Sequence, residues 1–253
     1  MLSINYFMLP KSEVKYIQSL SQKKFRAVHQ QFVAEGPKLI NELLTRKPGW
    51  VEKIYATEDW WSKQKATVKN KFQACFTATE TFELEKISNL QTPQDVLAVI
   101  EMPEAEADIS SAEGRILVLD GIQDPGNMGT IIRTAHWFGI DTIICSPDCA
   151  DVFQPKVVQS SMGSIFSVAV VYKNLEDFFA ENTKPVYGAL LNGQPVDTVT
   201  AATDAIILIG SEGKGIRLNL IPFITHPVTI PGFSDAESLN AAVATGILLY
   251  SFT

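Results

Sequence analysis

The sequence is poor in the residues that build disulfide frameworks and metal sites. Its 253 residues include three cysteines, Cys75, Cys145 and Cys149, which are too few for a disulfide framework. Cys145 and Cys149 have no further Cys or His nearby to complete a zinc site, and the three histidines are scattered along the chain. We therefore expect no metal ion in this protein.

The sequence also lacks a stretch that would enter a membrane. Residues 1–10 have neither the basic start nor the long apolar run of a signal peptide. The longest apolar runs, such as Ala241–Leu249, are too short to cross a bilayer, and this one contains Thr245 and Gly246. These absences predict a cytoplasmic protein without a membrane partner.

Charged residues are only 19% of the chain, but their distribution is uneven. Residues 1–100 hold 14 Lys and Arg against 10 Asp and Glu, a net charge of +4, whereas residues 101–253 hold 7 against 18, a net charge of −11. This asymmetry predicts that the first part of the chain meets a polyanion and the second does not.

An acidic segment with few large apolar residues, EMPEAEADISSAEG, runs from Glu101 to Gly114 and is the best candidate for a linker. We therefore expect one domain over residues 1–101, a linker over 102–114 and a second domain over 115–253. The first domain alternates short helices and strands, which predicts a small α/β fold. Its expected helices cover 11–20, 37–45 and 60–70, and its expected strands cover 51–56, 75–77 and 96–100.

The second domain alternates more clearly, and its strands are apolar throughout. Strands of this kind are buried on both faces, as in a parallel sheet covered by helices. The expected strands cover 116–119, 142–145, 168–171, 186–189, 205–209 and 228–230, and the expected helices cover 128–138, 154–162, 175–181, 216–220 and 238–252.

Three of the expected strands end in loops rich in glycine and polar residues. The loops are Asp120–Gly129, Gly210–Gly215 and Ile230–Asn240. Ligands of open parallel sheets bind outside the carboxyl ends of the strands, so these loops are candidates for a shared site. Taken singly each has a structural explanation, because Asn127 and Ser238 suit helix caps and the glycines suit turns.

Two residues resist that explanation. Arg133 lies within an otherwise apolar helical pattern, and Glu212 stands in a glycine turn that has no need of it. Together and in this order the three loops resemble the motifs of the SpoU (TrmH-like) family of SPOUT RNA 2′-O-ribose methyltransferases. The residues that carry the resemblance are Asn127, Gly129 and Arg133; then Gly210, Glu212, Gly213 and Gly215; then Ile230, Pro231, Ser238, Leu239 and Asn240. The loop departs from the family after Pro231, where Gly232-Phe233-Ser234-Asp235 stands in place of the more usual Met and later Gly.

The resemblance implies an enzyme that transfers a methyl group from S-adenosylmethionine to a ribose 2′-hydroxyl of structured RNA, either rRNA or tRNA. It also implies a parallel sheet closed by a deep trefoil knot, and a homodimer, for which the apolar segment Ala241–Tyr250 is suited. The catalytic residues it implies are Arg133, Asn127, Glu212, Ser238 and Asn240, and the cofactor-binding residues are Gly210, Glu212, Gly213, Ile230, Pro231, Ser238 and Leu239. By this resemblance Arg133 would either activate the hydroxyl as a base or clamp the target phosphate. Asn127 and Asn240 would orient Arg133 or the ribose, Glu212 would hold Arg133 or line the RNA site, and Ser238 would fix the loop by hydrogen bonding.

The first domain resembles the L30e-like substrate-binding domain that precedes this catalytic domain in the family. The resemblance runs through Lys23-Lys24-Phe25-Arg26 and the segment Phe32–Ile40. The residues expected to contact RNA phosphates are Lys11, Lys15, Lys23, Lys24 and Arg26.

Two other function classes compete with this interpretation. A dinucleotide-dependent oxidoreductase needs Gly-x-Gly-x-x-Gly after the first strand, and Gly121 and Gly126 do not have that spacing. A catalytically inactive RNA-binding or ribosome-assembly protein on the same fold is the other alternative, and binding of S-adenosylmethionine would distinguish it from an enzyme.

Overall fold

The computed structural model describes residues 8–103, 114–235 and 237–253, and these divide into two compact units. Unit 1 comprises residues up to Pro103 together with Phe153–Phe166, and unit 2 comprises Glu104–Val152 and Ser167–Thr253. Most of the expected linker, residues 102–114, lies outside the described residues.

Unit 1 is built on a four-stranded mixed sheet in the order β1-β4-β2-β3. The strands are β1 (Gln31–Glu35), β2 (Val51–Ala56), β3 (Phe76–Ala78) and β4 (Val96–Glu101), and only β2 and β3 pair in parallel. The helices are α1 (Lys11–Ser19), α2 (Lys23–His29), α3 (Pro37–Arg46), α4 (Glu58–Ser62), α5 (Ala66–Phe72) and α6 (Thr81–Ile87). Apolar residues of α1, α6 and the sheet, such as Ile17, Leu84 and Leu97, form a shared core, so the small α/β fold is as expected.

One further helix completes unit 1 from a distant part of the sequence. Helix α8 (Pro155–Ser160) packs against β1, with Val157 and Val158 buried. In the same segment the ring of Phe153 lies 4.7 Å from that of Phe32 on β1. Residues 153–166 thus group with the compact unit formed by the first domain, whereas the expected boundary leaves them in the second.

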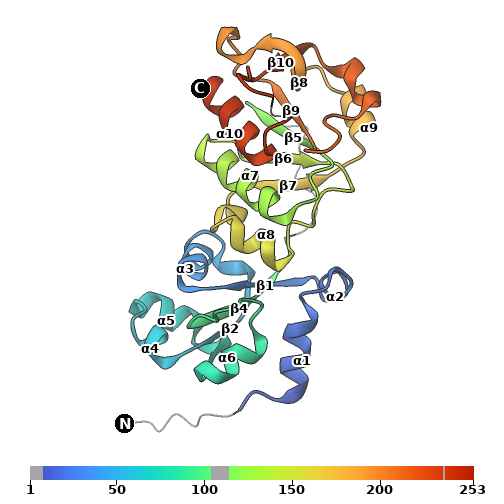
Figure 1. The fold of residues 1–253 in the computed structure, drawn as a ribbon. Helices are drawn as coiled ribbons and strands as arrows, with labels where there is room; N and C mark the ends of the chain where they lie inside the picture. Colours follow the sequence, from blue (N-terminus) through green and yellow to red (C-terminus); the bar gives the residue numbers. More distant parts are fainter. Residues whose placement is uncertain (1–7, 104–113, 236) are drawn as a thin grey trace. The chain divides into compact units, whose positions relative to one another are not determined.

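Unit 2 is a six-stranded, wholly parallel sheet in the order β10-β8-β9-β5-β6-β7 (Figure 1). Its strands are β5 (Ile116–Asp120), β6 (Thr142–Cys145), β7 (Ala169–Tyr172), β8 (Val186–Pro195), β9 (Ile206–Gly210) and β10 (His226–Thr229). Its helices are α7 (Pro125–Trp137), α9 (Leu175–Ala180) and α10 (Ala241–Ser251).

Both faces of this sheet are covered, which accounts for its continuous apolar strands. Val118 and Leu208 pack with Leu175 and Phe179 of α9 on one face. The alternate residues point to the other face, where α7 and α10 lie side by side (Figure 1). The chain leaves β5 toward β6 on one side and returns through β9 on the other, so the carboxyl ends of β5 and β9 flank the point where the strand order reverses.

Two of the expected helices differ in the structure. The segment expected as one helix over 60–70 is two, α4 and α5, because the backbone is extended at Lys65, with ψ 150°. The segment expected as a helix over 216–220 is a 3₁₀ helix over Leu218–Phe223 that contains Pro222, which has no N–H to continue an α-helix.

Candidate active site

Three side chains from distant segments meet at the carboxyl edge of the unit 2 sheet. The amide nitrogen of Asn240 donates to Asn127 Oδ1 at 2.9 Å and to Glu212 Oε1 at 2.8 Å. Asn127 Nδ2 also donates to Glu212 Oε1, as does the backbone N–H of Ala241 at 3.2 Å. One carboxylate oxygen thus holds together the start of α7, the loop after β9 and the start of α10; we call these three residues the Asn–Glu–Asn cluster.

The helix caps leave these side chains available for the cluster. Helix α7 is capped by Asp124, whose Oδ1 accepts from the backbone N–H of Asn127 at 2.8 Å, so the alternative role of Asn127 as a helix cap is wrong. Helix α10 is capped by Asn240, whose Oδ1 accepts from Ala242 and Val243 at 3.0 and 3.2 Å, so the alternative cap at Ser238 is wrong as well. Because Asn240 uses its oxygen for the cap and its nitrogen for the cluster, it serves both.

The loop after β9 is a tight hairpin that presents Glu212. Ser211 and Gly215 exchange two backbone hydrogen bonds, of 3.1 and 2.8 Å. A Cβ on Gly210 would lie 2.1 Å from the carbonyl carbon of Gly215, so only glycine fits at that position. Gly213 has no such neighbour, because a Cβ there would have nothing within 4 Å.

The far end of this hairpin is fixed by Arg217, a residue that the sequence reasoning missed. Asp120, at the end of β5, is 1% exposed and accepts two hydrogen bonds from Arg217: from its backbone N–H at 2.8 Å and from Nε at 2.5 Å. Arg217 also reaches Asp148 at 3.1 Å. The position of Asp120 at a strand end was the available signal in the sequence, but Arg217 lies outside the three motifs.

The pKa values of Asp148 and Arg217 are shifted in the direction that ion pairing favours. The hydrogen bond from Ser146 holds the pKa of Asp148 below its ordinary value, helped by the nearby Arg217. The hydrogen bond to Asp120 raises the pKa of Arg217. Arg217 is therefore a permanently charged anchor.

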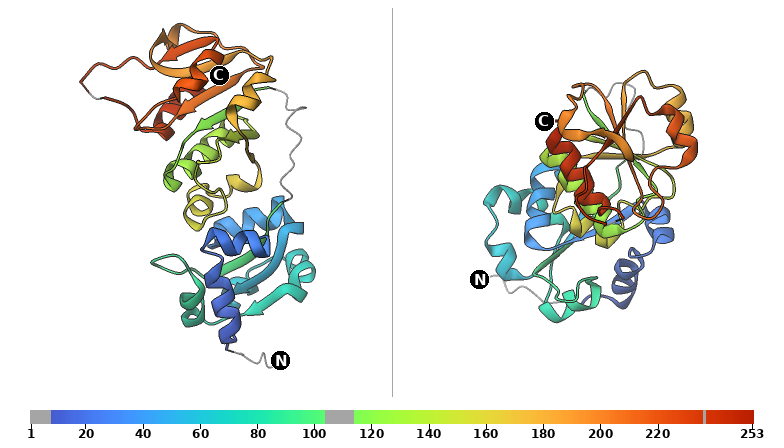
Figure 2. Two further views of the ribbon diagram at one scale, coloured as in Figure 1. Left: turned by 90° about the vertical axis from the view of Figure 1, so that its right-hand side faces the viewer. Right: turned by 45° about the horizontal axis from the view of Figure 1, so that its top comes forward.

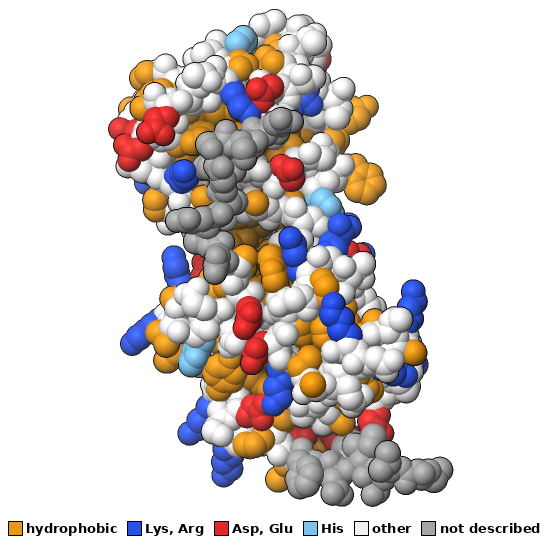
Figure 3. All heavy atoms as spheres, turned by 180° about the vertical axis from the view of Figure 1, so that it is seen from behind, with side chains coloured by type: hydrophobic (Ala, Val, Ile, Leu, Met, Phe, Trp, Pro, Cys, Tyr) orange, Lys and Arg blue, Asp and Glu red, His pale blue; other side chains and the backbone are white. Residues whose placement is uncertain are grey.

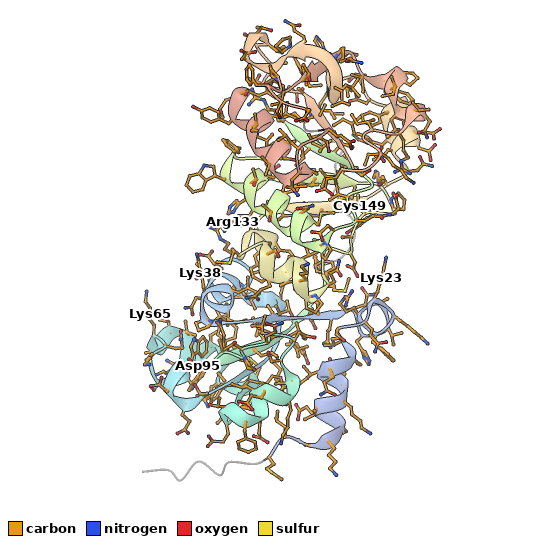
Figure 4. All side chains as sticks on the ribbon, in the orientation of Figure 1. Lys23, Lys38, Lys65, Asp95, Arg133 and Cys149 are labelled. Atoms are coloured by element: carbon orange, nitrogen blue, oxygen red, sulfur yellow. The ribbon has the colours of Figure 1, made fainter. Side chains whose placement is uncertain are left out.

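Arg133 stands apart from the Asn–Glu–Asn cluster. It lies six residues along α7 from Asn127, which on an α-helix is about 9 Å along the axis and about 120° around it. Its side chain is exposed and projects from α7 (Figure 4), and no hydrogen bond or ion pair joins it to another described residue. The expected contacts of Arg133 with Glu212, Asn127 and Asn240 are thus not formed within one copy of the chain.

The third loop offers an open main chain and apolar side chains. Between β10 and α10 the loop projects from unit 2 (Figure 2, left). Ile230 is half-buried, Pro231, Ser238 and Leu239 are exposed, and the backbones of Ile230, Gly232 and Leu239 make no hydrogen bond to other described residues. Free amide groups beside apolar side chains are the chemistry that an adenosine moiety needs, so these residues fit S-adenosylmethionine.

The basic residues expected on unit 1 divide into two groups. Lys11 and Lys15 on α1 and Lys23 and Lys24 on α2 are exposed, and Figure 3 shows Lys and Arg side chains spread over much of the visible face of this unit. Arg26 is only 2% exposed and donates to the carbonyls of Leu20 and Ser21 at 2.9 and 2.8 Å. Arg26 therefore ties α2 to the end of α1, and its expected role as a phosphate contact is wrong.

Among the residues with described positions, no group of three His, Cys, Asp or Glu side chains is arranged to hold a metal ion. No described helix is both long and apolar enough to cross a membrane.

Comparison with known proteins places this site in a family. The model of the SpoU rRNA methylase family matches residues 114–250, which contain all three loops. The chain belongs to the SpoU rRNA methylase family. The model of the MRM3-like substrate-binding domain matches residues 11–98, in unit 1.

Relatives of the SpoU family resemble this chain over nearly its whole length. The 23S rRNA (guanosine(2553)-2′-O)-methyltransferase RlmP of Bacillus subtilis is 34% identical, over 94% of each chain. An AdoMet-bound rRNA methyltransferase from Sinorhizobium meliloti has a TM-score of 0.86 and 30% identity, over 98% of this chain and 96% of that one. AviRb from Streptomyces viridochromogenes, solved with AdoMet, has a TM-score of 0.80 and 26% identity, over 96% of this chain and 97% of that one.

The SpoU fold, the cluster and these relatives together identify the activity. The protein is an S-adenosylmethionine-dependent methyltransferase that methylates a ribose 2′-hydroxyl of RNA. The predicted parallel-sheet catalytic domain and the substrate-binding domain ahead of it are both confirmed.

Proposed function

We propose that the substrate of this SpoU methyltransferase is ribosomal RNA, and that methyl transfer takes place beside the Asn–Glu–Asn cluster. The observation that carries the location is the shared Glu212 oxygen, which joins all three motif loops at the carboxyl edge of the sheet. The choice of ribosomal over transfer RNA is supported by RlmP, which resembles this chain over almost its full length.

The cofactor site is formed by the second and third loops. When bound, S-adenosylmethionine supplies an electrophilic methyl group. Apolar side chains of the third loop form the walls for adenosine, and the glycine hairpin lets the main chain approach closely. The residues of this site are Gly210, Glu212, Gly213, Ile230, Pro231, Ser238 and Leu239. Ser238 is exposed and holds the loop or a polar group of the ligand. The chain threads the trefoil knot of the SPOUT fold at this site.

Arg133 acts as a clamp on the phosphate next to the target ribose. A guanidinium side chain is almost always protonated in proteins, so acting as a general base would carry a large free-energy cost. A bidentate contact to phosphate instead places the hydroxyl and stabilises the negative charge that develops on its oxygen.

A homodimer explains why Arg133 lies apart from the cluster. Trp137 on α7 is 84% exposed, and Val243 and Tyr250 on the adjacent α10 are 51% and 74% exposed. Apolar side chains this exposed on two packed helices form a surface suited to a second copy of the chain. Arg133 is four residues from Trp137 and shares its helix face, so dimerisation through this surface brings Arg133 to the partner's cluster.

RNA phosphates are contacted by α1 and α2 of unit 1. Lys11, Lys15, Lys23 and Lys24 are exposed there, and the sequence from Val14 to Ala34 contains no Asp or Glu. Replacing Lys23 and Lys24 together by Ala should weaken RNA binding and reduce its dependence on salt by about two phosphate contacts. An unchanged salt slope would assign RNA contact to another surface.

The substrate is tested by mapping 2′-O-methyl groups in total RNA from cells with and without the gene. We expect one ribosomal position to lose its methyl group, and loss confined to tRNA would overturn the choice of substrate. In the purified protein, Arg133→Ala should abolish transfer while calorimetry shows unchanged S-adenosylmethionine binding. Failure of the wild-type protein to bind this cofactor at millimolar concentration would favour an inactive RNA-binding protein.

The placement of Arg133 across two copies is tested with mixed dimers. An Arg133→Ala variant, which is inactive alone, and a Glu212→Ala variant, which alone retains only slow residual transfer, are co-expressed with different tags and the mixed dimer is purified. If Arg133 serves the partner's cluster, one of the two sites in a mixed dimer is intact, so about half of the wild-type activity returns. An inactive mixed dimer would show that Arg133 acts within its own chain.

A further inference from the structure

Asp120 and Arg217 form a clamp that fixes the main chain as well as pairing two opposite charges. Both carboxylate oxygens of Asp120 are engaged by the same residue, one by the backbone N–H of Arg217 and the other by its guanidinium. A side chain bond alone would leave the main chain free to shift. Here the main chain at Arg217 is itself fixed to the end of β5.

The segment between this clamp and Glu212 has little freedom. Ser211 and Gly215 close the hairpin with two backbone hydrogen bonds. Gly210 packs directly on the backbone of Gly215, and Ile216 is buried in the core below. A displacement at Arg217 is therefore passed to Glu212 rather than absorbed between them.

We propose that Arg217 is a positioning residue for methyl transfer, which acts by holding the hairpin so that Glu212 reaches Asn127 and Asn240. Asp120 is almost completely buried, and a buried carboxylate is costly unless it is paired. The Arg217–Asp120 pair is thus the strong element of this group. The contact with Asp148 is weaker, because both side chains are nearly half exposed.

This proposal rests on the proposed role of Glu212. Limited proteolysis tests whether the clamp holds the hairpin, and it needs no measurement of methyl transfer. Lys214 is exposed at the tip of the hairpin and provides a trypsin site. The test variant is Arg217→Met combined with Asp120→Leu, which removes both the guanidinium bond and the backbone bond of the clamp without leaving a buried unpaired charge. Cleavage after Lys214 should become at least tenfold faster in this variant, whereas the control Asp148→Asn should stay within twofold of wild type. Unchanged cleavage in the clamp variant would overturn the proposal.

Turnover then distinguishes positioning from general stability. Methyl transfer to an unmodified 23S rRNA transcript is measured under single-turnover conditions, with and without Glu212→Ala. Loss of the clamp should lower the rate at least tenfold in the wild-type background but less than twofold in the Glu212→Ala background. Equal losses in both backgrounds would mean that Arg217 acts on the fold and not through Glu212.

A conservative variant provides the rescue. Arg217→Lys keeps the backbone bond to Asp120 and a positive charge, so its rate and its cleavage by trypsin should lie between those of the wild type and the clamp variant. Faster cleavage with a wild-type rate would overturn the proposal while leaving the Asn–Glu–Asn cluster in place.

Discussion

Asn240 combines two roles that substitution can separate. Its oxygen caps α10, and its nitrogen donates to Asn127 and Glu212. Replacement by Ala removes the cap, which costs about 1 kcal/mol. It also removes two exposed hydrogen bonds, one of them to a carboxylate, which add about 0.5–1 kcal/mol after allowance for solvent. For a protein of this size the sum of about 1.5–2 kcal/mol lowers Tm by roughly 3–8 °C.

Asn240→Ser separates the cap from the cluster. Serine caps helices about as well as asparagine but is too short to reach Glu212 and has no amide nitrogen to donate. Its Tm should therefore recover at least half of the loss seen with Ala, while its single-turnover rate of methyl transfer stays at least tenfold below wild type. Thermal unfolding followed by circular dichroism and a radiolabelled methyl-transfer assay measure the two effects. A Tm of Asn240→Ser as low as that of Asn240→Ala would refute the capping role, and a wild-type rate of methyl transfer in Asn240→Ser would refute the role of the cluster.

Two other predictions concern the hairpin and its surroundings. Gly210→Ala should destabilise the protein by several kcal/mol, because its Cβ would overlap the Gly215 backbone, whereas Gly213→Ala should unfold at nearly the wild-type urea concentration. Equal urea midpoints would contradict the packing. Asp148→Asn should be less stable than wild type above about pH 5, and the difference in the free energy of unfolding should close as the pH falls through the lowered pKa of Asp148. A carboxyl group whose pKa is lowered by folding stabilises the folded state fully above its unfolded pKa, and this stabilisation is lost as the group becomes protonated. Urea unfolding between about pH 2 and pH 6 measures this, and a difference that persists at the lowest pH would contradict it.

The parts of the fold that follow from local pattern were predictable. Apolar runs bounded by glycine and proline located the unit 2 strands, and the loops after β5 and β9 could be paired because ligand sites of parallel sheets share one edge. The edge argument made these loops candidates, and the resemblance to the SpoU family then singled out Asn127, Glu212 and Asn240 before their hydrogen bonds were known.

The failures concern tertiary contacts that leave no periodic signal. Nothing local distinguishes Arg26, whose guanidinium binds backbone carbonyls, from the exposed Lys23 and Lys24 beside it. Arg217 was missed because its partner, Asp120, lies 97 residues away. The position of Arg133 relative to Glu212 depends on the rotation of α7, which a motif spacing does not specify.

The assignment of residues 153–166 to unit 1 has a consequence for dissecting this protein. The chain passes between the units three times, near residues 103, 152 and 166, so neither unit is a single continuous stretch. A fragment beginning at residue 115 would carry α8 with Val157 and Val158 deprived of their cover on β1. Exchange of substrate-binding domains between relatives should therefore graft residues 153–166 together with the N-terminal half, because a single crossover at the linker would divide one hydrophobic core between two parents.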